Sequence, residues 1–152
     1  MEQTLVLIKP DGVQRGLVGV IIHRLERRGL RLAALKLLRV DEARARKLYE
    51  VHLGKRFYET LVSYICSSPV VALVWQGGGA IDIVRRTMGA TDPAEAPPGT
   101  IRGDFGINIG RNLIHGSDSP ESAAREVPIF FTPEEIVHYP RVLDPWYTEG
   151  EL

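Results

Sequence analysis

Apolar residues gather into four short runs along the chain, and each run has the length and composition of a β-strand. The clearest is Val70–Gln76, in which six consecutive apolar residues precede a polar glutamine. An unbroken apolar run of this kind is typical of a strand that is buried on both faces. Strands are predicted at Thr4–Ile8, Leu30–Val40, Val70–Gln76 and Asn112–Gly116.

Between these runs, apolar residues recur every three or four positions, which is the spacing of a helix with one buried face. Leu17, Ile21 and Leu25 predict a helix that stops at Gly29. Other helices are predicted from similar repeats or from N-terminal capping residues. One begins after the N-cap Asp41 and runs from Glu42 towards His52. Two follow from apolar repeats, one at Phe57, Leu61 and Ile65 that ends at Pro69, and one at Ile81, Val84 and Met88. Two more begin at the capping sequences Ser119-Pro120 and Thr132-Pro133-Glu134-Glu135.

Glycine and proline separate these elements. Lys9-Pro10-Asp11-Gly12 and Gly77–Gly79 have the composition of turns, and Gly89–Gly103 is predicted to be a long loop, ordered or mobile. A long loop in a compact domain tends to be functional. The order of elements predicts an α+β sandwich of the ferredoxin-like βαββαβ kind, with a four-stranded antiparallel sheet and helical insertions. We expect residues 1–152 to form a single domain.

The composition excludes several classes of protein. No apolar stretch approaches the roughly 20 residues that span a bilayer, and the first residues lack the features of a signal peptide. The chain has one cysteine, Cys66, which excludes an internal disulfide and a cysteine-rich zinc site and favours a cytoplasmic location. Nineteen basic and nineteen acidic residues balance, so the net charge does not favour a nucleic-acid partner.

The charge is nevertheless unevenly distributed. The segment from Arg24 to Lys47 has nine lysines and arginines against three acidic residues, whereas Asp118 to Leu152 has two against eight. Two explanations remain open at this point: two solvated faces of one subunit, or complementary faces that meet in an oligomer. Nucleic-acid binding by the basic segment, as a second activity, is a weaker alternative.

Three cationic side chains lie at the ends of predicted elements. Lys9 follows the first strand, Arg85 lies one position off the apolar stripe of its helix, and Arg102 closes the long loop. Because a guanidinium group can bind two phosphate oxygens at once, these cations could meet at a phosphate chain. Taken alone, each of them is better explained as a surface charge. Gly77–Gly79 lacks the Lys-Ser/Thr of a phosphate-binding P-loop.

His115 differs from the other three histidines because it lies between an apolar segment and the small residues Gly116 and Ser117. A neutral imidazole nitrogen can attack phosphorus near pH 7. The second ring nitrogen then needs an acceptor, for which Glu126 on the next helix is the candidate, and Gly116 would leave room for a phosphate. A purely structural histidine explains the same residues. No spacing of histidines and carboxylates indicates a protein-bound metal.

Several segments resemble the nucleoside diphosphate kinase family, in the same order along the chain. The resemblance extends from about Thr4 to Tyr147 and covers nearly the whole sequence. The segments are Thr4–Gly12, Ser68–Val74, Thr91–Pro93, Pro98–Phe105, Asn112–Asp118 and Thr132–Ile136. Small departures occur at Lys55–Tyr58, Asp92 and Gly77–Gly79, and none of them removes an expected phosphate or ribose contact.

The resemblance implies an enzyme that moves the terminal phosphate of a nucleoside triphosphate, mainly ATP, onto a nucleoside diphosphate by a ping-pong route. His115 matches the nucleophile of the family, and Glu126 matches its orienting carboxylate, with Ser117 between that carboxylate and the ring. The other matching positions bind the nucleotide. Arg85, Thr91 and Arg102 match positions that bind the phosphates, and Tyr49 matches a position near the transferring group. Lys9 and Asn112 match positions that bind the ribose hydroxyls. Phe57 matches the aromatic residue that stacks on the base, and Leu61 and Ile109 line the same slot.

The resemblance also implies Mg²⁺, bound mainly through the nucleotide phosphates, and a homo-oligomer. A hexamer is expected rather than a tetramer, because the chain continues to Leu152 through a segment with three aromatic residues and two prolines that suits contact with a neighbour. A tail folded on its own subunit is the alternative. The alternative function is a catalytically weak regulatory or nucleic-acid-binding protein on the same fold.

Overall fold

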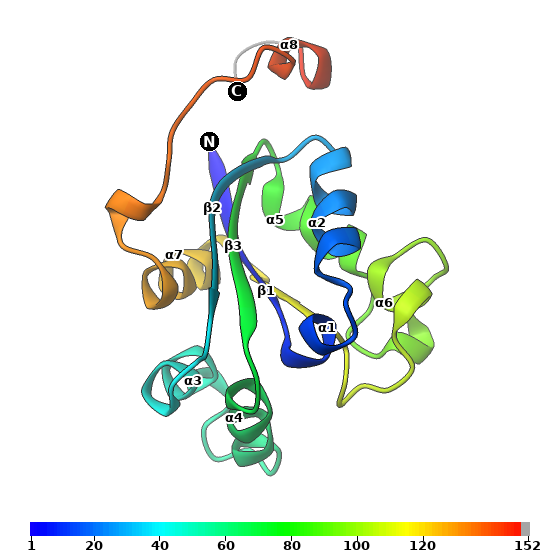
Figure 1. Ribbon diagram of the computed structural model, residues 1–152, viewed down its shortest axis with the longest axis vertical. Helices are drawn as coiled ribbons and strands as arrows, with labels where there is room; N and C mark the ends of the chain where they lie inside the picture. The colour runs from blue at the N-terminus through cyan, green and yellow to red at the C-terminus, as the bar shows by residue number, and fades with distance from the viewer. Residues whose placement is uncertain (150–152) are drawn as a thin grey trace.

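The computed structural model describes residues 1–149, which form a four-stranded antiparallel sheet with helices on both faces (Figure 1). The strands lie in the order β2-β3-β1-β4, and β1 pairs with β3 from Glu2 opposite Gly77 to Ile8 opposite Val71. This is the predicted ferredoxin-like arrangement. The strands are β1 (Glu2–Ile8), β2 (Arg31–Leu38), β3 (Val70–Gly77) and β4 (Ile114–Gly116).

The helices confirm most of the predicted periodic segments. The α-helices are α1 (Pro10–Gln14), α2 (Val18–Arg27), α3 (Glu42–Leu48), α4 (Tyr58–Cys66), α5 (Ala80–Met88), α6 (Ile101–Phe105), α7 (Pro120–Phe130) and α8 (Asp144–Tyr147). The 3-10 turns are η1 (Glu50–His52), η2 (Pro93–Glu95) and η3 (Pro133–Glu135). Among the described residues, no helix combines the length and hydrophobicity needed to cross a membrane.

The sheet separates two apolar cores, and alternate residues of β1 face each of them. Leu5 and Leu7 join residues of α3, α4 and α7 on one side, whereas Val6 and Ile8 join residues of α2 and α5 on the other. The six residues from Val70 to Trp75 are all buried, as the continuous apolar run predicts. Both central strands are therefore covered on both faces, and their ends hold the polar residues in fixed positions.

Several predicted boundaries are wrong. Lys9-Pro10-Asp11-Gly12 is the start of α1 rather than a turn, because Pro10 occupies the first helical position, where its missing N–H costs nothing. The segment Gly89–Gly103 is not a plain loop, since it includes η2 and the start of α6, which Thr100 caps.

Three other elements are shorter than predicted. The helix after Asp41 ends at Leu48 and is followed by η1, and the capping box at Thr132 opens the three-residue turn η3 instead of a full helix. The fourth strand begins at Ile114, because Leu113 before it has a φ of 74° that interrupts extended backbone.

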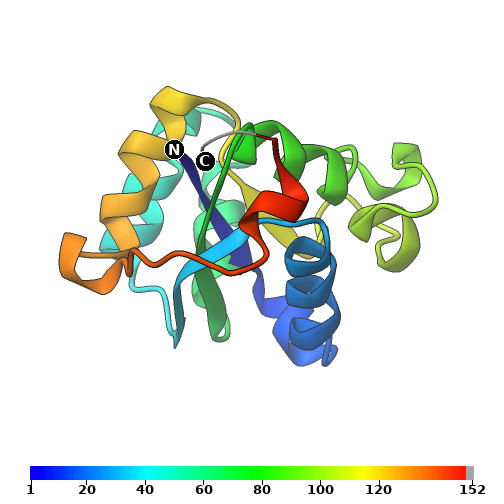
Figure 2. The same ribbon diagram turned by 90° about the horizontal axis from the view of Figure 1, so that it is seen from above.

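The C-terminal segment crosses the end of β2 within its own subunit (Figure 2). Val137 donates a backbone hydrogen bond to the carbonyl of Ala33, and the Arg141 guanidinium donates to the carbonyls of Gly29 and Leu30. Trp146 on α8 is nevertheless 85% exposed. The tail therefore packs on its own chain and still presents an apolar surface to solvent, so its predicted contact with a neighbouring subunit stays a prediction.

Candidate active site

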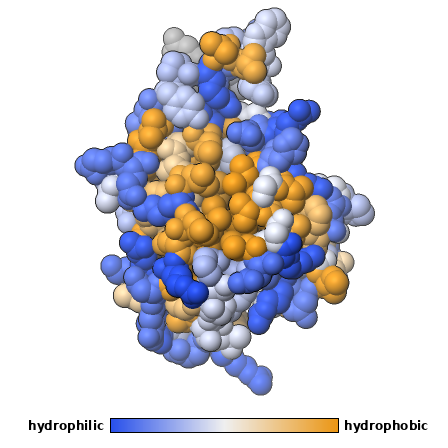
Figure 3. Space-filling model, viewed as in Figure 1, coloured by the Kyte–Doolittle hydropathy of each residue, from blue (hydrophilic) through white to orange (hydrophobic). Residues whose placement is uncertain are grey.

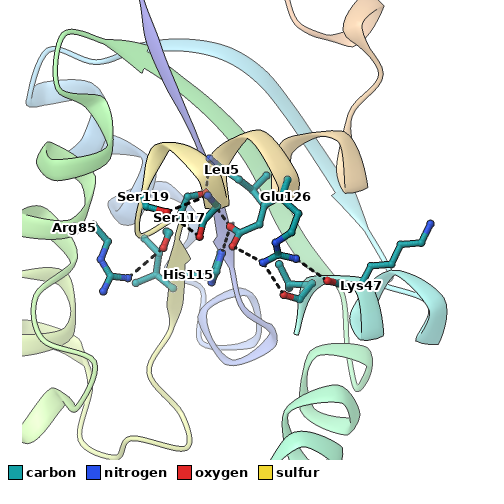
Figure 4. Close-up of polar contacts among 12 residues, drawn as sticks. Leu5, Lys47, Arg85, His115, Ser117, Ser119 and Glu126 are labelled. Atoms are coloured by element: carbon teal, nitrogen blue, oxygen red, sulfur yellow. Dashed lines mark hydrogen bonds and ion pairs between the residues drawn. The ribbon is translucent and has the colours of Figure 1, made fainter. Parts of the chain in front are cut away.

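His115 lies in the middle of β4, where it is opposite Leu7 of β1. Its Nε2 atom is 2.7 Å from Oε1 of Glu126, which projects from α7 (Figure 4). The His115 side chain is 20% exposed and the Glu126 side chain 6%. One side of the imidazole is therefore fixed by a buried carboxylate, while part of the ring remains accessible.

The Glu126 carboxylate accepts hydrogen bonds from several donors. Ser117 Oγ donates to Oε1 at 2.8 Å, and Arg125 Nη2 lies 3.4 Å from Oε2. Burial alone would raise the pKa of Glu126, but hydrogen bonds from His115 and Ser117, together with the charges of His115 and Arg125, outweigh it and hold the pKa below its usual value. Because Glu126 is an acceptor near neutral pH, Nε2 of a neutral His115 must carry the proton. Nδ1 then keeps its lone pair.

Two expectations for this segment need correction. Ser117 does not lie between Glu126 and the ring, since His115 contacts the carboxylate directly. Ser117 follows β4 and donates to the same carboxylate oxygen, while its Oγ accepts a hydrogen bond from Leu5 N of β1. The second expectation was that glycine at position 116 leaves room for a phosphate, and the structure gives a different reason for this glycine. A Cβ there would meet Met88 Sδ at 2.6 Å, so close packing of α5 on β4 accounts for the glycine.

Three cations contact the segment around His115. Arg85 Nη1 donates to the carbonyl of Gly116 at 3.2 Å, and Lys9 Nζ donates to Oδ1 of Asn112 at 2.7 Å. Burial, and secondarily the charge of Arg102, lower the pKa of Lys9 to about 7. Lys9, Arg85 and Arg102 therefore all contact the segment from Asn112 to Gly116, and their binding of phosphate stays a prediction.

Arg102 is 3% exposed and holds three carbonyl groups in place. Its Nε donates to Asn112 O at 3.1 Å, its Nη2 to Ile114 O at 2.6 Å, and its Nη1 to Gly89 O at 3.2 Å. Burial and the nearby Arg85 lower the pKa of Arg102 to about 10. The remaining N–H groups of the Arg102 guanidinium are available to an anion.

The other expected nucleotide-binding residues are placed more loosely. Thr91 joins the cluster, because its carbonyl accepts from Asn112 Nδ2 at 3.1 Å. Phe57 precedes α4 and is 47% exposed, and Leu61 follows it by one helical turn. Ile109, 57% exposed, lies between α6 and β4, and no polar contact in the described chain ties it to the cluster.

Tyr49 is buried at the C-terminal end of α3, and within residues 1–149 its hydroxyl has no hydrogen-bond partner. Burial, and then the charge of Glu126, hold the pKa of this phenol well above its usual range. An unpaired buried hydroxyl costs free energy and is available to a ligand oxygen.

Asp11, Tyr64 and Arg125 contribute to the site but were not predicted. Asp11 Oδ2 accepts from Leu113 N at 3.1 Å, and its Oδ1 accepts from the Tyr64 hydroxyl. This contact holds the left-handed backbone of Leu113, two residues before His115. Arg125 ties Glu126 to α3 through the carbonyl of Lys47 at 2.8 Å. These partners are largely backbone groups, which have no signature in the sequence.

Within the described residues, no cluster of three or more histidine, cysteine or acidic side chains is placed to hold a metal ion. The polar side chains near His115 include three cations, Lys9, Arg85 and Arg102, together with the Glu126 carboxylate. Such a site attracts anions, and a divalent cation would enter it most favourably when already bound to phosphate oxygens.

Comparison with known proteins identifies the family. The family model described as nucleoside diphosphate kinase matches residues 2–136. The nucleoside diphosphate kinase of Chloroflexus aurantiacus is 58% identical over 151 residues, covering 98% of this chain and 100% of the relative. That of Carboxydothermus hydrogenoformans is 55% identical over 149 residues, with the same coverage.

Solved structures agree with the sequence comparison. A nucleoside diphosphate kinase from Halobacterium salinarum, in complex with CDP, superposes with a TM-score of 0.95 at 49% identity, covering 97% of this chain and 99% of that one. A family protein from Babesia bovis also gives 0.95, at 42% identity. The matched region contains the His115–Glu126 pair and the cations around it, and the chain belongs to the nucleoside diphosphate kinase family.

Proposed function

We propose that the protein transfers the terminal phosphate of a nucleoside triphosphate, mainly ATP, to a nucleoside diphosphate through a phosphohistidine on His115. The observation that carries the proposal is the 2.7 Å contact between Nε2 of His115 and the buried Glu126 carboxylate. This contact leaves Nδ1 as the nucleophilic nitrogen. The family membership supplies the substrate class, and the structure from Halobacterium salinarum contains the nucleoside diphosphate CDP.

The reaction takes place in two half-reactions. Nδ1 attacks the γ-phosphorus, the N–P bond forms, and the bond from that phosphorus to the β,γ-bridging oxygen breaks, releasing the diphosphate. The ring becomes cationic while it carries the phosphoryl group, and the Glu126 carboxylate on Nε2–H stabilises that charge. The terminal phosphate oxygen of a second diphosphate then attacks the phosphorus, the N–P bond breaks, and His115 is restored.

The surrounding cations are suited to the phosphates. We propose that Arg85, Arg102 and Thr91 hold the phosphate chain, that Tyr49 offers its hydroxyl near the transferring group, and that Lys9 with Asn112 binds the ribose hydroxyls. Phosphoryl transfer depends mainly on positioning and charge stabilisation, which several donors around one chain supply. Because the pKa of Lys9 is about 7, approaching phosphates would favour its protonated form.

We propose Mg²⁺ as the divalent ion, held mainly by nucleotide phosphates. When bound, it neutralises phosphate charge and orients the chain. We also propose that residues 1–152 act as a single domain in the cytoplasm. The two apolar cores on one sheet support the single domain, and the single cysteine agrees with a reducing compartment.

Steady-state kinetics test the proposed reaction. With ATP and CDP varied against each other, double-reciprocal plots should give parallel lines, because the first product leaves before the second substrate binds. Lines that intersect would show that both nucleotides bind at once, and would contradict the covalent route.

Phe57 is expected to stack on the nucleotide base. Replacing it with alanine should weaken the binding of every nucleotide by about 1–3 kcal/mol, because stacking depends little on base identity. Binding of ADP, GDP, CDP and UDP to both proteins can be compared by titration calorimetry. A loss confined to one base would contradict stacking as its role.

We expect the protein to form a homohexamer. The edge strand β2 exposes Leu35 and Leu37, at 53% and 67%, and Figure 3 shows apolar side chains gathered over the face on which this strand lies. Exposed apolar edges are typical of interfaces. Light scattering should give about six times 16.9 kDa, and truncation after Ile136 should lower the mass or the thermal stability. A mass near four chains, or a truncated hexamer of unchanged stability, would contradict this.

A further inference from the structure

A second concentration of positive charge lies outside the candidate active site, in a pocket of about 550 Å³. Its walls come from α2, from α5 and from the segment before α6. The lining residues are His23, Arg24, Arg27, Arg28, Arg86, Thr87 and Gly99. We call it the arginine pocket. Four of these residues are arginines and none has a carboxylate, although acidic and basic residues balance in the whole chain.

The four arginines differ in how firmly they are held. Arg24 is fixed, since its Nη1 contacts Asp104 at 2.6 Å and its guanidinium lies 4.8 Å from the centre of the Phe105 ring. Arg86 pairs with Asp82 at 2.9 Å, but both side chains are about three-quarters exposed. The pair therefore contributes little to stability, and Arg86 can leave Asp82 to bind a ligand.

Arg27 and Arg28 carry the uncompensated charge of the pocket. Both are exposed, and in the described part of the chain neither has an ion-pair partner. Cations in the last turn of α2 also stabilise the helix dipole, which explains part of this arrangement. Arg86 lies in the last turn of α5, so the same effect applies to it, but the effect does not require the cations of two helices to line one pocket, as they do here.

The chemistry of the lining indicates the ligand. A planar guanidinium group can bind two phosphate oxygens at once. Several guanidinium groups that lie apart from one another suit a chain of phosphates better than one compact anion. The lining residues include no phenylalanine, tyrosine or tryptophan ring on which a base could stack. The volume is within the range of small-ligand sites.

A nucleic acid fits the surface less well than a short phosphate chain, because the basic segment from Arg24 to Lys47 does not form a continuous strip. Arg31 is buried, Lys36 pairs with Glu135 at 2.6 Å, and Arg46 is occupied by two glutamates. We propose that the arginine pocket is a second anion site, separate from His115, that binds an inorganic oligophosphate.

Calorimetric titration with sodium tripolyphosphate tests the proposal, with ADP at saturation to fill the nucleotide site. The wild-type protein should bind one tripolyphosphate per chain. The Arg27→Gln/Arg28→Gln variant should bind it at least tenfold more weakly. The charge-matched Arg39→Gln/Lys47→Gln variant alters two exposed cations outside the pocket and should bind within twofold of wild type. Unchanged kinase activity in both variants would show that the fold is intact.

Three results would overturn the proposal. The first is the absence of tripolyphosphate binding when ADP fills the nucleotide site. The second is equal weakening in both double variants, which would show diffuse attraction rather than a built site. The third is displacement of tripolyphosphate by a single-stranded oligonucleotide at lower concentration, which would make the surface a nucleic-acid site.

Discussion

Replacing His115 with alanine should reduce phosphoryl transfer by about 10⁴-fold or more, because the substitution removes the group that carries the phosphate in both half-reactions. The fold should survive, since the His115 side chain is partly exposed and its polar contact is with Glu126. The measurement is a coupled assay of ATP and CDP turnover, combined with circular dichroism of the variant.

His138→Ala is the matched control for this experiment. His138 is exposed in the tail, and no role in transfer is proposed for it. We expect the control to retain the wild-type rate. A His115→Ala protein that kept more than a few per cent of that rate would show that phosphate passes directly between nucleotides or through another residue.

Arg102→Met should lower the free energy of unfolding by about 3 kcal/mol. The substitution keeps much of the side-chain volume but leaves the carbonyls of Gly89, Asn112 and Ile114 without their buried donor. Unsatisfied buried acceptors cost about 1–3 kcal/mol each, and release of a buried guanidinium to water offsets part of the sum. Urea unfolding at one fixed protein concentration measures the change.

Arg39→Met provides the comparison, because Arg39 is exposed and such positions change stability by about 0.5 kcal/mol or less. A similar small change in Arg102→Met would show that the three contacts do not support the segment before His115. The variant should also raise the KM for ATP, because Arg102 is proposed to bind the phosphate chain as well.

The fold was predictable where the pattern of apolar positions is regular. The continuous run at Val70–Trp75 and the helical spacing of Leu17, Ile21 and Leu25 both place the observed elements within a few residues. The short elements were not predictable in the same way. Pro10 is equally common in turns and at the start of helices, and only packing of the chain after β1 decides between them.

The site was predictable at its chemical groups but not at its backbone partners. His115 and Glu126 meet as expected, because β4 and the following helix α7 bring their side chains to one place. Arg102 was expected to bind phosphate, and the structure adds its three carbonyl partners. Backbone carbonyls are the same in every residue, so the sequence cannot indicate which of them an arginine will hold.

Gly116 shows that the sequence alone can suggest the wrong explanation for a small residue. Next to a proposed nucleophile, a glycine suggests space for substrate, whereas the observed constraint is the contact of β4 with Met88 on α5. Such a constraint depends on which elements pack together, and it becomes visible only once the fold is known.

The central claim is that His115 carries the phosphoryl group on Nδ1, and labelling with [γ-³²P]ATP in the absence of a diphosphate tests it most directly. The protein should become labelled, the label should be labile in acid and stable in base, and added CDP should remove it as CTP. Proteolysis and mass spectrometry should place the phosphate on the peptide that contains His115, and ³¹P NMR should identify the Nδ1 isomer. An acid-stable label, a label on another residue, or no label in an active protein would contradict the account.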